Sequence, residues 1–458
     1  MSWLNDNALP RIPEPPLKNM ERWITDADGR VIIFHGVNMI NKLPPYTLSA
    51  TGFGVHDAEL LASNGINAVR VGVIYSAVEP APGLYDDKYL ADIRETVAML
   101  ASHGIMSLID FHQDGWGPSF VCEGFPEWAT FTDEHPIRPL SNFPLMLLTS
   151  KAIHAAFDNF WANKHGPGHR GLQDRFAAAW AHTAKTLRGT KGILGWEILN
   201  EPFPGSANAE ALTAFTQKVV NAIRTEDTEH MIWYEPWVTF DFGVPTGIGQ
   251  INDPASTRRI GMAFHNYLPV ELFGLVWKHA VEHSSKTGDA LLLTEFGGIT
   301  SASLIEKMMN SVDGAMMPAL FWAYWCRTPY QITALWKHIS SAELGIVYDP
   351  TRPLIAGNVS EDKLTALTRP YPMFIAGTPV QWSFASDTLD FNLEYSRTSG
   401  APLKSEITEI FVPKRRYTKG YSVSVTGGKR LPSRNEQAVL ILNDTGATTV
   451  TVEIKGAS

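Results

Sequence analysis

The chain has little cysteine and no long apolar segment. Cys122 and Cys326 are the only cysteines in 458 residues, which excludes a disulfide scaffold and a zinc site built from several cysteines. The two can be free buried thiols or form one bridge. No apolar run reaches about 18 residues, so we expect no transmembrane helix. Residues 1–20 have no basic stretch followed by an apolar one, so no signal peptide is predicted and a cytoplasmic location stays open.

Basic residues are also in short supply. Lys and Arg number 38 against 47 Asp and Glu, which gives a formal net charge of −9. An acidic protein repels phosphate groups, which argues against nucleic acid as a partner and disfavours an anionic membrane surface. Hydrophobic residues make up 44% of the chain, the proportion of a globular protein with a sizeable core.

Between residues 30 and 365, short apolar runs alternate with amphipathic stretches. Most of the runs are continuous, as in parallel strands that are buried on both faces. The predicted strands are 31–40, 66–73, 105–112, 193–202, 231–237, 260–267, 290–297 and 319–325. Helical patterns lie between them, and several stop at a glycine, such as Gly65 or Gly104. This alternation predicts a (β/α)8 barrel. A doubly wound open sheet is the rival, but no G-x-G-x-x-G follows the first strand.

The character of the chain changes at about residue 366. Short alternating strands, split by Gly, Pro, Asn and Asp, replace the helical periodicity. The predicted fold class is therefore an α/β (β/α)8 TIM barrel, residues 1–365, followed by an antiparallel β-sandwich domain, residues 366–458. The longest irregular stretch, residues 113–155, follows the third predicted strand. A loop of that length in a compact fold is usually functional.

Polar or aromatic side chains follow the ends of the predicted strands. In a (β/α)8 barrel these ends form the active site. Taken singly, each has a structural explanation, such as a buried ion pair for Arg70, a core histidine for His265 or core packing for Trp325. So many of them at one rim are hard to explain by packing alone. In strand order they are Asn38 and Lys42, Arg70, Asp110, His112 and Asp114, Asn200 and Glu201, Glu235 and Trp237, His265 and Tyr267, Glu295, and Trp325.

Two of the carboxylates in this set stand out, Glu201 on the fourth predicted strand and Glu295 on the seventh. Neither has a companion at metal-ligand spacing, so we predict no metal and no cofactor. Paired carboxylates without a metal point to glycoside hydrolysis. Aspartic proteolysis fits poorly, because it uses aspartates in β-rich halves. A Ser–His–Asp hydrolase would need a G-x-S-x-G after a strand, and the sequence has none there.

At this point the sequence resembles a known family. Asn200–Glu201–Pro202, the His-x-Tyr of the sixth strand and "TEFG" (294–297) resemble glycoside hydrolase family 5, a group of retaining (β/α)8 glycosidases. The appended sandwich and four further segments resemble the endoglycoceramidases within that family. These segments are "DFHQDGWGP" (110–118), "PEWAT" (126–130), "GWEILNEPF" (195–203) and "YDPTRP" (348–353). The resemblance covers nearly the whole chain.

The resemblance implies a role for each candidate residue. Glu201 would be the general acid/base and Glu295 the nucleophile. The substrate would contact Lys42, His112, Asp114, Asn200, Tyr267 and Trp325. Among these, Asn200 would bind the sugar 2-hydroxyl, Tyr267 would orient Glu295, and Trp325 would stack on the sugar at the cleaved bond. Arg70 would keep the pKa of Glu295 low, and His265 would support the site. Repulsion between the close carboxyls would raise the pKa of the acid.

The implied reaction is hydrolysis of the bond between an oligosaccharide and ceramide in a glycosphingolipid, with retention. The enzyme would be a monomer, secreted or cell-associated, that acts at a membrane or micelle surface. Because the leaving group is a lipid, we expect apolar residues near the acid, which residues 113–155 could supply. The sugar attached to ceramide stays undecided.

Two alternatives remain open. One is another family-5 retaining β-glycosidase, such as a β-glucosidase, glucosylceramidase or β-glucanase. The other is a non-catalytic glycolipid-binding protein, which would not need both Glu201 and Glu295.

Overall fold

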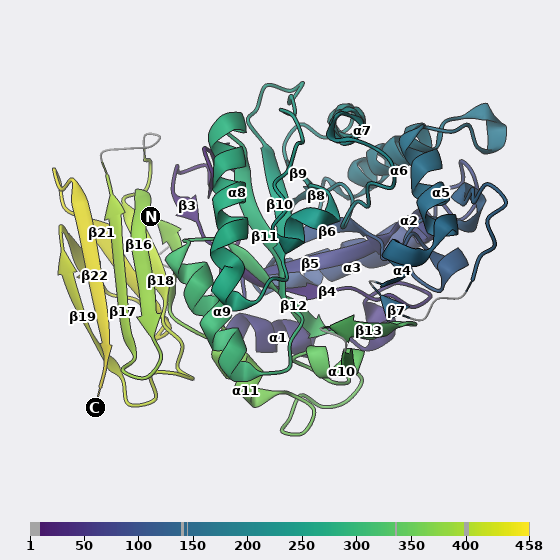
Figure 1. The fold of residues 1–458 in the computed structure, drawn as a ribbon. Helices are drawn as coiled ribbons and strands as arrows, with labels where there is room; N and C mark the ends of the chain where they lie inside the picture. Colours follow the sequence, from purple (N-terminus) through teal and green to yellow (C-terminus); the bar gives the residue numbers. More distant parts are fainter. Residues whose placement is uncertain (1–9, 139–141, 144, 335–336, 398–402, 458) are drawn as a thin grey trace.

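A closed barrel forms the larger part of the molecule (Figure 1). The computed structural model describes residues 10–138, 142–143, 145–334, 337–397 and 403–457. Within them eight parallel strands close in the order β10-β11-β12-β4-β5-β6-β8-β9. They are β4 (His35–Met39), β5 (Ala68–Ile74), β6 (Met106–His112), β8 (Ile193–Glu197), β9 (Met231–Tyr234), β10 (Ile260–Asn266), β11 (Ala290–Gly297) and β12 (Ala319–Trp325). The predicted barrel is confirmed.

Helices surround the barrel. They are α1 (Val55–Ser63), α2 (Tyr75–Val78), α3 (Asp87–Ser102), α4 (Leu145–Thr149), α5 (Lys151–Trp161), α6 (Leu172–Leu187), α7 (Ala209–Arg224), α8 (Phe273–Thr287), α9 (Ala302–Gly314), α10 (Ser341–Leu344) and α11 (Glu361–Leu367). The short 3-10 helices are η2 (Ser49–Thr51), η3 (Pro118–Phe120), η4 (Glu127–Ala129), η5 (Pro167–His169), η6 (Val238–Phe242) and η7 (Val270–Leu272). Across the described ranges, none of the helices has the length and apolar character needed to cross a membrane.

Local sequence signals set where the helices begin and end. The Asp86 side chain accepts hydrogen bonds from the backbone N–H groups of Lys88 and Tyr89, which starts α3. Gly65 follows α1 with a φ of 77°. A Cβ at this glycine would stand 2.3 Å from the Phe411 ring, so the glycine serves both the turn and the contact with the second domain.

The remaining strands form a β-sandwich beside the barrel (Figure 1). One sheet has the order β1-β2-β3-β15-β18-β21-β20 and the other β16-β17-β22-β19. The strands are β1 (Lys18–Met20), β2 (Trp23–Thr25), β3 (Val31–Ile32), β15 (Tyr371–Ile375), β16 (Thr378–Ala385), β17 (Asp390–Ser396), β18 (Ile407–Phe411), β19 (Tyr421–Thr426), β20 (Gly428–Leu431), β21 (Ala438–Asn443) and β22 (Thr449–Gly456). The predicted sandwich is confirmed.

The first strands that the structure describes, β1 to β3, lie in the sandwich sheet. The predicted first strand, 31–40, is two strands in the structure. β3 pairs antiparallel with β15 of the sandwich, whereas β4 enters the barrel. The division of the chain after residue 365 stays a prediction, and the strands of the sandwich sheet come from both sides of it.

The sandwich packs against the amino-terminal ends of the barrel strands. One hydrophobic cluster joins Ala68, Met106 and Ala290, at the starts of three barrel strands, to Trp382 and Phe411 of the sandwich. Since the candidate residues follow the carboxyl ends of the strands, the sandwich lies at the opposite end from them.

The stretch from 113 to 155 is more regular than predicted. It contains η3, η4, α4, the start of α5 and β7 (Asn142–Phe143), which joins β13 (Gln331–Ala334) and β14 (Lys337–Ile339) in a small sheet. Most of its large apolar residues are core: Trp116 is fully buried and stacks on Phe125, with 4.1 Å between ring centroids. Both cysteines are free and buried, so they are not bridged.

Candidate active site

Arg70, on β5, lies at the centre of the rim formed by the carboxyl ends of the strands. Its side chain is fully buried and faces four carboxyl groups. Nη2 lies 3.1 Å from both Asp110 Oδ2 and Glu235 Oε1, Nε lies 2.6 Å from Glu197 Oε2, and Nη1 donates to Glu295. One cation cannot balance four buried anions. The pKa values of Asp110 and Glu235 are therefore raised well above the ordinary range. Burial is the largest cause, and the neighbouring carboxylates add to it.

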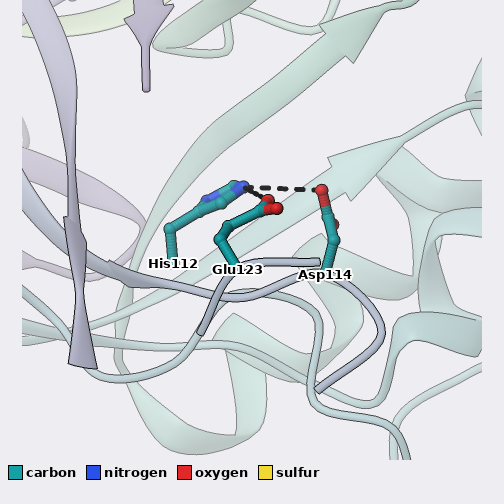
Figure 2. A group of neighbouring side chains, drawn as sticks. All are labelled: His112, Asp114 and Glu123. Carbon is teal, nitrogen blue, oxygen red and sulfur yellow. Dashed lines mark ion pairs between the residues drawn. The ribbon is translucent and has the colours of Figure 1, made fainter. Parts of the chain in front are cut away.

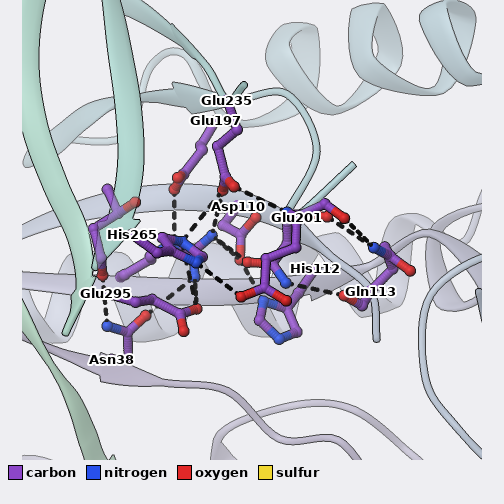
Figure 3. A network of polar contacts seen from close by, with 12 residues as sticks. Asn38, Asp110, His112, Gln113, Glu197, Glu201, Glu235, His265 and Glu295 are labelled. Atoms are coloured by element: carbon purple, nitrogen blue, oxygen red, sulfur yellow. Dashed lines mark hydrogen bonds and ion pairs between the residues drawn. The ribbon is translucent and has the colours of Figure 1, made fainter. Parts of the chain in front are cut away.

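The two predicted catalytic carboxylates lie close together. One side-chain oxygen of Glu201, one of Glu295 and a ring nitrogen of His265 all lie within 4.8 Å of one another. Figure 3 shows these side chains gathered around His265. Retaining glycosidases hold their carboxyl groups about 5–5.5 Å apart, and inverting ones about 6.5–9.5 Å apart, to leave room for a water molecule. The spacing is that of a retaining pair.

Glu201 is held by its backbone as well as by its side chain. Its φ is 43°, in the left-handed region that glutamate rarely adopts. Its N–H donates to Glu235 Oε2 at 2.9 Å, and its carbonyl accepts from the Gln113 amide at 3.0 Å. The side-chain Oε1 contacts His265 Nδ1 at 3.0 Å. Burial, and after it the Asp114 carboxylate, raises the pKa of Glu201 to about 8, so this group carries its proton at neutral pH.

Glu295, at the end of β11, accepts hydrogen bonds from Arg70 and from the Tyr267 hydroxyl. We predicted that its pKa stays low, and this is wrong. Burial of the carboxyl raises the pKa of Glu295 above its ordinary value, although His265 and Arg70 act in the opposite direction. Arg70 stabilises the carboxylate but shares its charge among four partners, so desolvation outweighs it.

Asn200 and His112 also lie at this rim, and each offers polar atoms to a ligand. Asn200 Oδ1 accepts from Arg70 Nη2 at 2.8 Å, and its amide donates to the Gln113 carbonyl at 2.9 Å. That amide carries a second hydrogen, which a sugar hydroxyl could accept. His112 Nδ1 contacts Asp110 Oδ2 at 2.7 Å, and its buried Nε2 has no hydrogen-bond partner within the described residues. Burial lowers the pKa of His112, which leaves Nε2 free to accept from a hydroxyl.

Lys42, Asp114 and Tyr330 form a buried polar cluster beside His112, together with Glu123. The Lys42 ammonium donates to Asp114 and, at 3.0 Å, to the Tyr330 hydroxyl, and lies 3.2 Å from Glu123 Oε1. Figure 2 shows the His112 ring facing both carboxylates. Burial alone would lower the pKa of Lys42, but the two carboxylates raise it above its ordinary value. The cluster therefore keeps its cation.

Trp322, and not the predicted Trp325, faces this cluster. The Trp322 ring is parallel to that of His112, with 6.1 Å between centroids and 9° between planes. The Lys42 ammonium lies 4.7 Å from the centre of the same ring. Trp325 instead belongs to the large hydrophobic core. The register of β12 with β4 shifts between Phe321 and Trp325, so the alternation of a regular strand could not predict which tryptophan faces the site.

Comparison with known proteins decides the family. The model for "Cellulase (glycosyl hydrolase family 5)" matches residues 54–331, more than half of the chain, and the model for "Glycoside hydrolase family 5 C-terminal domain" matches residues 369–455. The chain belongs to glycoside hydrolase family 5. The family resemblance predicted from the strand-end motifs is confirmed.

Relatives within family 5 match almost the whole chain. "Endoglycoceramidase I" of Rhodococcus hoagii is 28% identical over 477 residues, covering 97% of this chain and 89% of the relative. The solved structure "Endo-glycoceramidase II from Rhodococcus sp." superposes with a TM-score of 0.79 at 26% identity, covering 95% of this chain and 100% of that one. A second structure of that enzyme, described as a lactosyl-enzyme intermediate, superposes with a TM-score of 0.76 at 25% identity. The match covers 95% of this chain and 100% of that one.

Several residues of this family-5 site were not predicted as site residues. Gln113 fixes the carbonyls of Asn200 and Glu201, Glu123 and Tyr330 contact Lys42, and Asp241 of η6 lies near Glu201. Gln113 directly follows β6, whereas Asp241 lies in η6 and Glu123 and Tyr330 lie in loops, where periodicity carries no information. Glu197, inside β8, is a further buried carboxylate that contacts Arg70.

Among the residues that the structure describes, three groups of side chains have the composition of metal ligands. They are His112–Asp114–Glu123, Glu197–Glu235–His265 and Glu201–His265–Glu295. Lys42 or Arg70 lies against a member of each group, so a bound metal ion would meet a fixed positive charge. The side chains of these groups therefore fit a hydrogen-bonded site that contains Lys42 and Arg70 as its cations better than they fit a metal site.

Arg70 is expected to be essential for the fold as well as for the site. Arg70→Met leaves its buried carboxyl partners without their cation, and we expect the free energy of unfolding to fall by about 3–5 kcal/mol. Thermal unfolding measures this loss. The control is Lys278→Met, which removes an exposed ion pair with Glu282 and should cost less than about 0.5 kcal/mol. Equal melting temperatures for the two variants would contradict a central role for Arg70.

Proposed function

We propose that this chain is a retaining endoglycoceramidase, which cleaves the bond between the glycan and ceramide of glycosphingolipids and releases both intact. The spacing of Glu201 and Glu295 supports retention. The two names found for close relatives support the substrate class. The observation that carries the proposal is the contrast between the two sides of the catalytic pair.

Glu201 and Glu295 divide the barrel rim into two arcs. Glu201 follows β8 and Glu295 ends β11, so the strand order places β12, β4, β5 and β6 on one arc and β9 and β10 on the other. A linear substrate whose scissile bond lies between the carboxylates extends one end over each arc. The chemistry of each arc therefore indicates which end it binds.

The arc of β12, β4, β5 and β6 is polar. It carries the cluster of Lys42, Asp114, Glu123 and Tyr330, with Trp322 against it. Charged hydrogen-bonding groups beside an aromatic face are suited to sugars, whose hydroxyls need donors and acceptors and whose C–H faces stack on rings. We assign the glycan to this arc.

The arc of β9 and β10 is apolar and exposed. Phe242, Val244, Leu272 and Leu275 have exposed fractions of 53%, 50%, 52% and 42%. Gly243 lies against Leu275, which brings the segment after η6 together with the start of α8. We call these four residues the apolar patch. Large exposed apolar side chains beside a catalytic residue suit a lipid aglycone or the surface of a membrane or micelle. Residues 113–155 also expose Val121, Ile137, Leu145 and Leu148, but this stretch follows β6, on the arc that we assign to the glycan. We therefore place ceramide on the apolar patch.

The mechanism that follows has two steps. Glu295 attacks the anomeric carbon while Glu201 gives its proton to the ceramide oxygen, which breaks the C–O bond and leaves a glycosyl-enzyme. Glu201, now a carboxylate, then takes a proton from water as the water oxygen displaces Glu295 from the same carbon. Two inversions give net retention. Arg70 and Tyr267 stabilise the Glu295 carboxylate when it leaves.

The test is release of ceramide. The protein is incubated with a ganglioside, with a glycolipid that has galactose on ceramide and with glucosylceramide, each in detergent micelles. Mass spectrometry then looks for free ceramide and intact glycan, with Glu295→Gln as the blank. Ceramide from a glycan-bearing lipid supports the proposal, and the preferred lipid identifies the first sugar. Hydrolysis of aryl β-glycosides without ceramide from any lipid would refute it.

The apolar patch gives a second, matched prediction. Val244→Asp places a charge in the patch, whereas Val380→Asp places one on a valine of the sandwich. The two valines are similarly exposed, with exposed fractions of 50% for Val244 and 45% for Val380. We expect Val244→Asp to raise KM for the micellar glycolipid roughly tenfold, the cost of losing one buried valine. Val380→Asp should change it little, and neither should affect a soluble aryl glycoside. Equal effects of both variants on the glycolipid would contradict the assignment of the patch.

A further inference from the structure

Asp241 is a buried carboxyl beside the acid/base that the two-step mechanism does not use. It lies in η6, between β9 and β10, and only 2% of it is exposed. Its Oδ2 has no hydrogen-bond partner among the described residues and lies 3.7 Å from His265 Nδ1. The same nitrogen contacts Glu201 Oε1, and the Asp241 carboxyl is within hydrogen-bonding reach of Glu201. A buried polar atom without a partner is costly and calls for a functional explanation.

The surroundings of Asp241 favour its neutral form. The titratable groups that face it are Glu201 after β8, His265 and Tyr267 from β10 and its end, and Glu295 on β11. On the α8 side, His279 lies against the neighbouring Phe240, with 6.4 Å between ring centroids. Burial, followed by the charges of Glu201 and Glu295, raises the pKa of Asp241 well above the ordinary range. Asp241 therefore carries an O–H at neutral pH.

The Asp241 backbone is fixed, so the position of this carboxyl does not depend on a ligand. Its carbonyl accepts from the Tyr267 N–H at 3.2 Å, which ties η6 to the residue that holds the nucleophile. Exposed Phe242 of the apolar patch is the next residue in the chain. The segment thus places a neutral acid on the inner side of the rim.

We propose that Asp241 is a positioning residue for Glu201: its O–H donates a hydrogen bond to the Glu201 carboxylate that forms when the proton passes to the leaving group. The Asp241 proton stays on Asp241 throughout. In the first step the Glu201 proton moves to the glycosidic oxygen, and in the second Glu201 takes a proton from water. A fixed donor aimed at the charge that develops on Glu201 would stabilise the transition state of the first step. The proposal rests on family-5 chemistry at Glu201 and is independent of ceramide as substrate.

The test compares two replacements of similar size. Asp241→Asn keeps an N–H donor but cannot ionise, and Asp241→Leu has no donor. The readout is the pH profile of kcat/KM for an aryl β-glycoside with a poor leaving group, so failure of the ceramide assay does not affect it. We expect Asp241→Asn to keep the basic limb of the wild-type profile. Asp241→Leu should move that limb upward by about one pH unit, because the Glu201 carboxylate loses a charge-assisted donor.

Two outcomes would overturn the proposal. An unshifted basic limb in Asp241→Leu means that no donor acts on Glu201, and equal shifts in both variants mean that shape rather than the donor matters. If Asp241→Leu does not fold, carbon NMR of the wild type labelled at the aspartate carboxyls decides. At pH 6 one signal at the position of a protonated carboxyl, missing in Asp241→Asn, supports the proposal. Its absence overturns it.

Discussion

Glu295→Gln should abolish turnover and leave the fold intact. The amide keeps the shape of the side chain, and its one carbonyl oxygen can still accept from Arg70 while its NH2 donates to the Tyr267 hydroxyl oxygen, but it cannot attack an anomeric carbon. Removal of a catalytic nucleophile typically costs about 10⁴–10⁶-fold in kcat. Steady-state kinetics on an aryl β-glycoside measure the loss, and thermal unfolding shows whether the variant is folded.

The stereochemistry of rescue distinguishes the nucleophile from the acid/base. With Glu295→Gly, azide can enter from the vacated face and convert an activated β-glycosyl substrate into the α-glycosyl azide. With Glu201→Gly, azide attacks the glycosyl-enzyme from the other face and gives the β-glycosyl azide. Exchange of these two products between the variants would reverse the assignment of Glu201 and Glu295.

Glu201→Gln should slow the cleavage of poor leaving groups by about 10²–10⁴-fold, the usual contribution of a positioned proton donor. Because burial raises the pKa of Glu201 to about 8, the wild-type kcat/KM should fall as the pH rises through about 8 and the acid loses its proton. The acid limb should reflect Glu295, which must be ionised, and lie above the ordinary value for glutamate. Since Glu201 and Glu295 interact, the apparent pKa of each limb is a property of the pair rather than of one residue.

The control experiment uses a substrate with a better leaving group. An activated aryl glycoside does not need a proton for departure, so Glu201→Gln should form the glycosyl-enzyme from it at nearly the wild-type rate, and the basic limb should disappear. A basic limb near pH 8 that persists in Glu201→Gln would show that another group controls it.

The barrel could be predicted from sequence because its strands are continuous apolar runs that end in polar residues. β11 shows this directly: Ala290–Gly297 is the predicted strand to the residue, and its one carboxylate is Glu295. The first strand could not be predicted correctly, because residues 31–34 are all apolar and nothing in them marks the break between β3 and β4. The change of partner between Ile32 and His35 depends on pairing with β15, over 300 residues later.

The site could be predicted where a residue follows its own strand, as for Glu201 and Tyr267. Asp241 comes from η6 and Glu123 from a loop, and only the closed barrel brings them to Glu201 and Lys42. The pKa of Glu295 was mispredicted for a related reason. The sequence places Arg70 near the nucleophile, but it does not reveal that three other carboxyls compete for the same guanidinium.

The pairing of β3 with β15 has a consequence for the order in which the molecule assembles. During synthesis Val31 leaves the ribosome long before its partner strand β15. At a synthesis rate of about 5–20 residues per second, the delay is on the order of tens of seconds. Until then the amino ends of the barrel strands and the first three sandwich strands expose apolar surface that only residues after 370 cover. The last fifth of the polypeptide thus covers apolar surface of the segments synthesised before it. Nascent chains that lack this last fifth should bind chaperones.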